Sequence, residues 1–203
     1  SIIRWIETAV DLAVKGEVRG VVTAPISKAP LYEAGFKFPG HTEFLAALTA
    51  EVPMDCARGP VMMLTSGDLR AVLVTIHVPV AKVASALTQE AVIQTATVTA
   101  QAMIRDFGIA KPRLVLAGLN PHAGEGGTIG DEEIRLLAPA VADLQAQGID
   151  CVGPKPADTL FHEEARNTYD AVICLYHDQA LIPVKMLDFW GGVNVSLGLP
   201  IVR

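Results

Sequence analysis

The sequence predicts an α/β fold in which helices cover the faces of a largely parallel β-sheet. The first observation is composition: 51% of the 203 residues are hydrophobic and 19% are charged, which is enough apolar material for a substantial core. The second is an alternation of short apolar runs, typical of buried strands, with segments whose apolar residues recur at helical spacing. The third is that the length fits one large domain or two small ones, with no internal repeat and no linker-like segment.

The N-terminal part of the chain predicts two helices separated by a strand and loops. Apolar residues recur every three or four positions after Ile2, as on one face of a helix, and Gly16 is typical of a helix end. A short Val-rich run then indicates a buried strand. In order, the expected elements are a helix over 2–15, a strand over 20–25, a helical turn capped by Ser27, a loop over 35–40 and a helix from Thr42, as its N-cap, to Leu48.

The rest of the chain predicts a hairpin, Ala-rich helices and further strands. Ser66-Gly67-Asp68 separates two apolar runs and favours a turn between paired strands. In order, the expected elements are strands over 60–64 and 70–76, two helices within 80–107 that break near Thr88, a strand over 113–119, a glycine-rich loop over 120–130, a helix over 131–147 ended by Gly148, and strands over 151–153, 171–175 and 191–195.

Charge and cysteine content exclude several classes of protein. The formal net charge is −6 without a basic run, so we expect neither a nucleic-acid partner nor a membrane partner. Cys56, Cys151 and Cys174 are odd in number and widely spaced, which predicts no disulfide framework and favours a reduced, cytoplasmic setting. The chain starts at Ser1 within a helical pattern and stops after Arg203 without a cap, so we expect a fragment of a longer protein.

Three histidines follow predicted strands: His77, His122 and His177. Ligands bind beyond the carboxyl ends of the strands in an open parallel sheet, so these side chains can converge. Neutral imidazoles suit Zn²⁺ and other borderline divalent metals, and a three-histidine site leaves positions open for substrate oxygens. Alternatively, each histidine caps or hydrogen-bonds near a helix start. We favour the metal site for the three together and interpret His162 as a surface residue.

Two cations flank a polar residue near the end of the chain. Lys185 and Arg203 lie on either side of Asn194 in a stretch dominated by Val, Leu, Ile and Gly. A charged group in apolar surroundings needs a partner, and a phosphate or carboxylate would serve through charge-assisted hydrogen bonds. Ordinary surface charge is the alternative. Lys28 is a similar, weaker candidate.

The loop around His122 and an acidic residue further on have two interpretations each. Gly124, Gly126 and Gly127 allow positive φ, so the loop is a tight connection, and Asn120 with exposed backbone amides can also face a ligand. Asp158 is interpreted as a helix N-cap. The alternative is an acid that orients a metal-bound histidine.

Several long motifs in order resemble those of the 4-hydroxythreonine-4-phosphate dehydrogenase family, which acts in pyridoxal phosphate biosynthesis. The resemblance covers essentially the whole chain. The motifs are Gly40-His41-Thr42-Glu43-Phe44-Leu45, Met62-Met63-Leu64 with Leu69-Arg70, Leu119 to Gly127, Pro156 to Phe161, Tyr176-His177-Asp178-Gln179 and Asn194 to Pro200.

This resemblance implies an isocitrate/isopropylmalate-dehydrogenase-like fold, a three-layer α/β/α, two-domain subunit present here as a partial chain. It further implies a homodimer whose active site is shared between the subunits. By the same comparison, residues 1–30 are part of a terminal-segment domain, residues 31–190 form a central α/β domain with the metal ligands, and residues 191–203 return to the terminal-segment domain.

The resemblance also implies roles for individual residues. The metal ligands are His77, His122 and His177, one of them expected from the partner subunit, and the metal is Zn²⁺, Mg²⁺ or Co²⁺. The nicotinamide cofactor is NAD or NADP, and no residue of this chain is assigned to it. Candidate substrate contacts are His41, Thr42, Lys185, Asn194 and Arg203. The general base is left open; the candidate catalytic residues are Lys185, Asp158 and Asp178.

The activity implied is metal-dependent, NAD(P)-linked oxidation of 4-phosphohydroxy-L-threonine to a β-keto acid, which loses CO₂ to give 3-amino-2-oxopropyl phosphate. Within the family, D-threonate or D-erythronate 4-phosphate and aromatic cis-dihydrodiols are alternative substrates. From other classes, a metal-dependent hydrolase or aldolase and a metal-binding fragment without turnover stay open.

Overall fold

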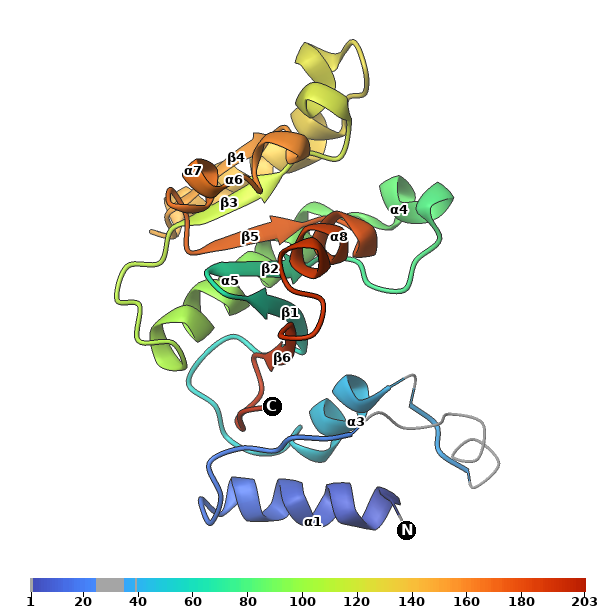
Figure 1. Cartoon of the computed structure of the whole chain (residues 1–203), viewed down its shortest axis with the longest axis vertical. Coiled ribbons are helices and arrows are strands. Elements are labelled where there is room, and N and C mark those ends of the chain that lie inside the picture. Colours follow the sequence, from blue (N-terminus) through green and yellow to red (C-terminus); the bar gives the residue numbers. More distant parts are fainter. Residues whose placement is uncertain (1, 25–34, 39) are drawn as a thin grey trace.

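The described residues form a six-stranded sheet with helices on both faces. The structure, a computed structural model, describes residues 2–24, 35–38 and 40–203. Across the sheet the strands lie in the order β4-β3-β5-β2-β1-β6 (Figure 1). In chain order they are β1 Val61–Ser66, β2 Leu69–Leu73, β3 Leu114–Ala117, β4 Cys151–Lys155, β5 Ala171–Cys174 and β6 Val193–Leu197.

Most of the sheet is parallel, as the sequence predicts. β4, β3, β5 and β2 pair in parallel, so their carboxyl ends meet at the same edge of the sheet. β1 runs antiparallel to both β2 and β6, which makes β6 parallel to β2. The antiparallel strand arises because β1 and β2 form the predicted hairpin, whose turn contains Gly67 at a φ of 58°. A turn this short reverses the chain, whereas a parallel connection needs a long crossover.

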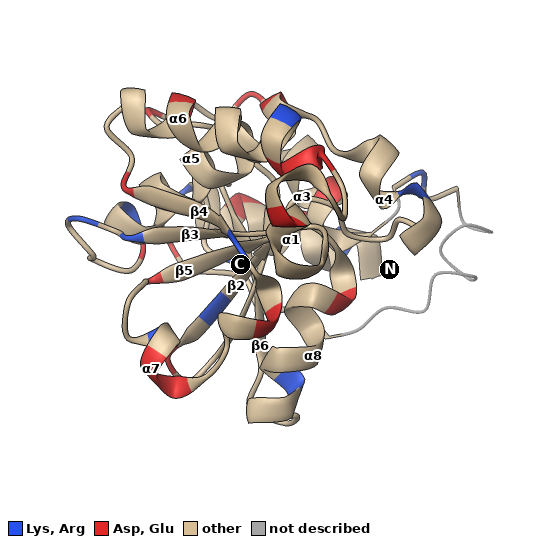
Figure 2. Cartoon of the chain, turned by 90° about the horizontal axis from the view of Figure 1, so that it is seen from above, with Lys and Arg blue, Asp and Glu red and all other residues tan. Residues whose placement is uncertain are grey.

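Helices cover both faces of the sheet and make it the middle of three layers, α/β/α. Figure 2 shows α5 and α6 on one face and α7 and α8 on the other. The helices are α1 Ile2–Val14, α3 His41–Leu48, α4 Val80–Ala86, α5 Gln89–Arg105, α6 Ala138–Ala146, α7 Glu163–Arg166 and α8 His177–Leu187, with the shorter helical segments η1 Pro121–Gly127, η2 Glu133–Leu137 and η3 Ala157–Thr159.

The two faces of β5 show how one strand serves both layers. Successive side chains of a strand point to opposite faces of its sheet. Ile173 belongs to the core under α5 and α6, where it joins Met103 and Leu144. Val172 belongs to the core under α8, where it joins Val184. Each of these side chains is at most 1% exposed, so the apolar run of β5 is buried on both faces.

A third, smaller core lies outside these layers. α1 and α3 lie beyond the β6 edge of the sheet (Figure 1). Their apolar faces meet residues that follow β6; the buried members of this cluster are Ile6, Val10, Val21, Phe36, Phe44, Leu45, Leu199 and Ile201. Residues from both ends of the described chain therefore share one cluster. The division into domains at 1–30, 31–190 and 191–203 stays a prediction.

The predicted break in the Ala-rich helical region is confirmed. α4 ends before Thr88, whose hydroxyl oxygen accepts a hydrogen bond from the Ala91 amide at 3.1 Å and so caps α5. The helix predicted over 131–147 begins as a π-helix, η2, and continues as α6. It ends before Gly148, which has a φ of 80°.

Two predictions for the N-terminal part are wrong, and one lies outside the described residues. Residues 20–24 form no strand, because a single backbone hydrogen bond from the Val21 amide to the Val202 carbonyl does not make a ladder. Gly40, not Thr42, is the N-cap of α3, because the Thr42 hydroxyl lies 3.4 Å from the Ser196 hydroxyl instead of on the helix end. Ser27, like Lys28, falls among the residues that are not described.

Charged residues of both signs are interspersed over the helices and loops (Figure 2). With a formal net charge of −6, an anionic ligand must be held by individually placed cations and not by the overall field. In the ranges given above, no helix combines the length and the apolar character needed to cross a lipid bilayer.

Candidate active site

The polar residues predicted from the sequence follow the parallel strands at the edge where those strands end. His77 follows β2, His122 follows β3, Asp158 follows β4 and His177 follows β5. Because the four strands pair in parallel, these residues lie along one side of the sheet.

His77 and His177 come together. Their ring centroids are 5.9 Å apart, and both line a cavity of about 280 Å³ with Tyr176 and Asp178. Nδ1 of His177 lies 2.7 Å from Oδ1 of Asp178. A carboxylate in this position favours the proton on Nδ1 and leaves the Nε2 lone pair for a ligand. Asp178 therefore orients one imidazole of the pair.

His122 lies in the neighbouring cavity. This cavity, of about 450 Å³, is lined by His122 together with Asn120, Asp158 and Gln179, and Tyr176 lines both cavities. The predicted N-cap role of Asp158 is wrong, because Pro156 occupies the N-cap of η3 and Asp158 lies inside that turn. Its carboxylate is thus placed with His122 instead of on a helix end.

A left-handed turn carries His122. From His122 to Gly126, five consecutive residues have φ between 43° and 76°. Positive φ was predicted for the glycines of this loop, but His122, Ala123 and Glu125 share it. For a residue with a Cβ, the left-handed region costs about 1–2 kcal/mol. Such backbone persists only where the surrounding structure holds it in place.

A buried carboxylate lies under this turn. Glu133 is 4% exposed, and its Oε1 accepts hydrogen bonds from the amides of Leu119 and Asn120, both at 2.8 Å. Its Oε2 accepts a third from Nδ2 of Asn120 at 2.9 Å. Sequence reasoning missed this residue, because a Glu pair at the start of a helix is typical of a solvated first turn.

A second buried side chain joins two strand ends. Gln179 is 7% exposed; its Nε2 donates to the Gly118 carbonyl at 2.8 Å and its Oε1 accepts from the Leu175 amide at 2.7 Å. Gly118 follows β3 and Leu175 follows β5, so this one amide fixes the spacing between the strands that lead to His122 and His177. The motif Tyr176-His177-Asp178-Gln179 was identified in the sequence, but no role was predicted for its glutamine.

The donor set fits a metal in part. Two imidazoles that share a cavity are suitable ligands for zinc and similar divalent ions. Among the residues that the structure describes, no three His, Cys, Asp or Glu side chains are grouped closely enough to hold a metal ion. The described part of the chain thus brings two imidazoles together, and their role as metal ligands stays a prediction. Convergence of His122 with His77 and His177 stays a prediction.

The predicted anion-binding residues form a second group around Arg203. Its Nη1 donates to the Ser196 hydroxyl at 3.2 Å and its Nη2 to the Thr23 hydroxyl at 3.3 Å. The Ser196 hydroxyl is also 3.4 Å from the hydroxyl of Thr42. In the described part of the chain no carboxylate pairs with this guanidinium, and burial lowers its pKa. Arg203 lines a cavity of about 660 Å³ with Asn194, and an anion there would supply the missing charge.

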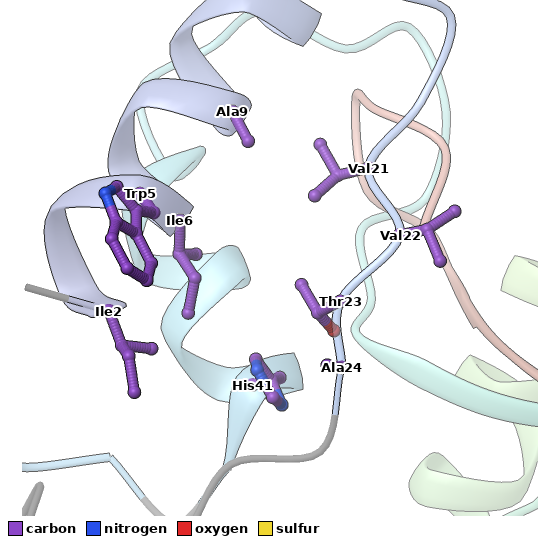
Figure 3. Close-up of a pocket in the computed structure, with 9 residues that line it drawn as sticks. All are labelled: Ile2, Trp5, Ile6, Ala9, Val21, Val22, Thr23, Ala24 and His41. Atoms are coloured by element: carbon purple, nitrogen blue, oxygen red, sulfur yellow. The ribbon is translucent and has the colours of Figure 1, made fainter.

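His41 lies next to this group, in a mainly apolar cavity of about 380 Å³ (Figure 3). Trp5 and Ile6 of α1 line one side of it, and Thr23 lines both this cavity and that of Arg203. Burial, and then the charge of Arg203, lower the pKa of His41, so its imidazole is neutral at pH 7. Its Nε2 is buried without a hydrogen-bond partner among the described residues. A neutral imidazole with a free nitrogen is ready for a polar ligand atom.

Lys185 lies apart from these residues. It is exposed on the last turn of α8, with its Nζ 5.4 Å from the centroid of the Phe189 ring. None of the cavities described above includes Lys185 among the residues that line it. Its predicted contact with substrate, like that of Asn194, stays a prediction.

Fold and candidate site together define the class of protein: an α/β protein with imidazoles after its parallel strands and, in a separate group, a guanidinium that pairs with no carboxylate among the described residues. The family can then be stated. The chain belongs to the PdxA family, whose model, described as pyridoxal phosphate biosynthetic protein PdxA, matches residues 1–203.

Individual relatives agree with this assignment. The chain is 71% identical over 202 residues to a 4-hydroxythreonine-4-phosphate dehydrogenase of Caulobacter vibrioides, covering 100% of this chain and 61% of that protein. A solved structure of a 4-hydroxythreonine-4-phosphate dehydrogenase from Klebsiella pneumoniae matches with a TM-score of 0.88 and 41% identity, over 99% of this chain and 59% of that one.

A third relative carries a different name. The solved structure of a terephthalate 1,2-cis-dihydrodiol dehydrogenase from Burkholderia xenovorans matches with a TM-score of 0.76 and 31% identity, over 98% of this chain and 60% of that one. The chain thus spans about 60% of the length of the relatives it matches.

Proposed function

We propose that the whole protein is a metal-dependent, NAD(P)-linked dehydrogenase that oxidises 4-phosphohydroxy-L-threonine. The product is a β-keto acid, which decarboxylates to 3-amino-2-oxopropyl phosphate on the route to pyridoxal 5'-phosphate. The observation that carries the proposal is the guanidinium of Arg203, whose side-chain partners among the described residues are two hydroxyls. It lies near the neutral imidazole of His41, whose Nε2 has no partner in the same part of the chain. A phosphorylated hydroxy acid offers both the anion and the polar atoms that these groups lack.

The metal ligands in this proposal are His77 and His177 of one subunit with His122 of a second copy. The pairing of His77 with His177 in one cavity supports a half-site in each chain. The chemistry that Zn²⁺, Mg²⁺ or Co²⁺ supplies when bound is polarisation of the substrate hydroxyl, and the chemistry of NAD or NADP is acceptance of the hydride. The contribution of Asp178 is to hold the His177 imidazole in the tautomer that binds.

The residues around Arg203 bind and orient the substrate. The guanidinium donates charge-assisted hydrogen bonds to the phosphate, and the Thr42 hydroxyl and the Asn194 amide add contacts beside it. Nε2 of His41 hydrogen-bonds a substrate oxygen or amine, and burial keeps this ring neutral. Lys185 adds a second cation from the end of α8.

The proton acceptor is one of three candidates, and their surroundings differ. Asp158 is exposed and lines the cavity that also contains His122. Asp178 is already hydrogen-bonded to His177, and Lys185 lies over the ring of Phe189. Placement beside His122 supports Asp158 as the first of the three to test.

A homodimer with a shared active site and a cytoplasmic location complete the proposal. α8 begins at His177, and its outer face exposes Ile182 and Met186, with Trp190 91% exposed just beyond the helix end. An apolar face of this kind, starting at a half-site, supports a second copy as the partner. The three cysteines are free thiols, as expected in a reduced setting.

One alternative substrate has a specific observation behind it. The likeness to the terephthalate 1,2-cis-dihydrodiol dehydrogenase favours testing an aromatic cis-dihydrodiol carboxylate, whose anion would also pair with Arg203. D-threonate and D-erythronate 4-phosphate carry the same phosphate and belong in the same assay.

The test is metal content and NADH or NADPH formation with the full-length protein. Four proteins are compared: wild type, His77→Ala, His122→Ala and the matched control His162→Ala, a surface histidine that caps the short helix α7. Metal-dependent turnover of 4-phosphohydroxy-L-threonine that the first two substitutions abolish and the control retains is the expected result. Turnover only on another substrate changes the pathway, and bound metal without dinucleotide reduction favours a hydrolase or aldolase.

A further inference from the structure

We propose that Glu133 is a positioning residue, whose buried carboxylate holds the left-handed turn and thereby fixes the direction of the His122 side chain. The consequence for metal binding rests on the proposed function above. The placement of His122 itself does not, since it follows from contacts within this chain.

The first step is the set of hydrogen bonds at the start of the turn. One carboxylate oxygen of Glu133 accepts hydrogen bonds from the amides of Leu119 and Asn120, and the other accepts one from the Asn120 side chain. Both amides precede Pro121, which has no amide hydrogen to contribute. In the described chain no Lys, Arg or His pairs with Glu133. The three N–H donors therefore stabilise its charge in the buried environment.

The second step is that the turn packs directly on this carboxylate. A Cβ at Gly124 would lie 2.8 Å from Oε2 of Glu133, and a Cβ at Gly118 would lie 3.3 Å from its Oε1. The backbone therefore touches the carboxylate before the turn and again in its middle. His122 lies between these two close approaches, so we expect the position of its backbone to depend on Glu133.

The third step is why a carboxylate is needed. All three neighbouring groups are N–H donors, and a carboxylate presents acceptors on both oxygens. An amide at this position would turn an NH₂ group toward one donor and lose that bond. The π-helical turn η2, which begins at Glu133, is a rare conformation that is frequent at functional sites.

The adjacent Glu132 provides a matched control. It is only partly buried, and its Oε2 accepts a hydrogen bond from Nδ2 of Asn120 at 2.8 Å, but within the described residues it makes no hydrogen bond to the backbone of the turn. Glu132→Gln thus makes the same chemical change one residue away, where the contacts are to the side chains of Asn120 and Arg135.

The experiment compares Glu133→Gln, Glu133→Ala and Glu132→Gln in the full-length protein. The readouts are amide hydrogen exchange over residues 119–127, the NMR signals of the His122 ring without metal, and Zn²⁺ affinity by chelator competition. For Glu133→Ala, which removes all three hydrogen bonds, we expect roughly tenfold faster exchange, a shifted His122 ring signal and about tenfold weaker Zn²⁺ binding, and for Glu133→Gln a smaller change in the same direction. Glu132→Gln is expected to stay close to wild type, and thermal unfolding checks that each variant is folded.

A double-mutant cycle tests whether the effect passes through His122. In a His122→Ala background, Glu133→Gln is expected to weaken Zn²⁺ binding no further. If exchange and the His122 ring signal are unchanged in both Glu133 variants, the proposal is overturned. It is also overturned if the turn loosens while Zn²⁺ affinity stays the same. If the wild type binds no Zn²⁺, the metal-dependent function fails, and the exchange and ring signals alone decide on Glu133.

Discussion

Replacement of Gln179 by Glu tests whether the amide between β3 and β5 holds the site together. The two side chains have nearly the same shape, so the change is chemical. The Glu oxygen that replaces Nε2 would face the Gly118 carbonyl at the present distance of 2.8 Å, acceptor against acceptor. The other oxygen would keep the bond from the Leu175 amide.

The expected decrease in the free energy of unfolding follows from the hydrogen bond that the substitution removes and the charge that it buries. An unsatisfied buried carbonyl costs about 1–3 kcal/mol, and an uncompensated buried charge raises the cost toward 3–5 kcal/mol. We therefore expect Gln179→Glu to lower the free energy of unfolding by about 3–5 kcal/mol at pH 7. Gln179→Met removes both hydrogen bonds without adding a charge, and we expect about 2–4 kcal/mol.

The two variants differ in their pH dependence. Burial and the Gly118 carbonyl favour the protonated carboxyl, so the pKa of the introduced Glu is higher in the folded protein than its unfolded value of about 4.3. Below pH 4.3 the protonated group can donate to the carbonyl, and stability is largely regained. Stability is then lost as the pH rises from the unfolded pKa to the folded one. The loss in Gln179→Met is expected not to depend on pH.

The assay is urea unfolding, followed by circular dichroism, at several pH values between 4 and 8, with wild type subtracted at each pH. Gln94→Glu is the matched control, because the exposed Gln94 also donates to a backbone carbonyl, that of Arg58 at 2.7 Å. We expect the control to change stability by less than about 1 kcal/mol. A Gln179→Glu protein within that same margin at pH 7 would refute the reasoning.

Three further predictions concern a helix cap, an ion pair and the anion cavity. Thr88→Ala is expected to cost about 1 kcal/mol in urea unfolding through loss of the α5 cap, and an unchanged midpoint would contradict that role. Burial raises the pKa of Asp170, but hydrogen bonds from Arg113 outweigh it and the net shift is downward. This pair stabilises above the unfolded pKa and its contribution is lost as the pH falls through the folded pKa, so Asp170→Asn should destabilise at pH 7 and hardly at pH 2.5. In steady-state kinetics Arg203→Met should raise KM for the phosphorylated substrate about 10–100-fold, whereas Arg19→Met, on the exposed rim of the same cavity, should change it little.

Local patterns in the sequence predict most of the elements that the structure contains. The helix break at Thr88 and the hairpin turn at Gly67 depend on neighbouring residues only, and both were predicted. The strand predicted over 20–25 failed because an apolar run becomes a strand only where another strand pairs with it. Thr42 was misplaced for a similar reason, since its hydroxyl lies by Ser196, 154 residues away in the sequence.

The sequence could predict which edge of the sheet carries the candidate site, but not which of its residues are neighbours. Parallel strands bring their carboxyl ends to one edge, so His77, His122 and His177 could be assigned to it before the structure was known. Strand order decides which of them are neighbours: β2 lies next to β5, which pairs His77 with His177. Glu133 could not be found, because its role depends on a backbone conformation that non-glycine residues rarely adopt.

The cluster that joins both ends of the described chain bears on the order in which the protein takes shape during synthesis. Ile6 and Val10 of α1 pack with Leu199 and Ile201, so this core closes only after those late residues have left the ribosome. The Arg203–Thr23 hydrogen bond spans 180 positions across the same junction. An anion held by Arg203 would then link two segments that are distant in the sequence, and a bound ligand would protect this region against proteases.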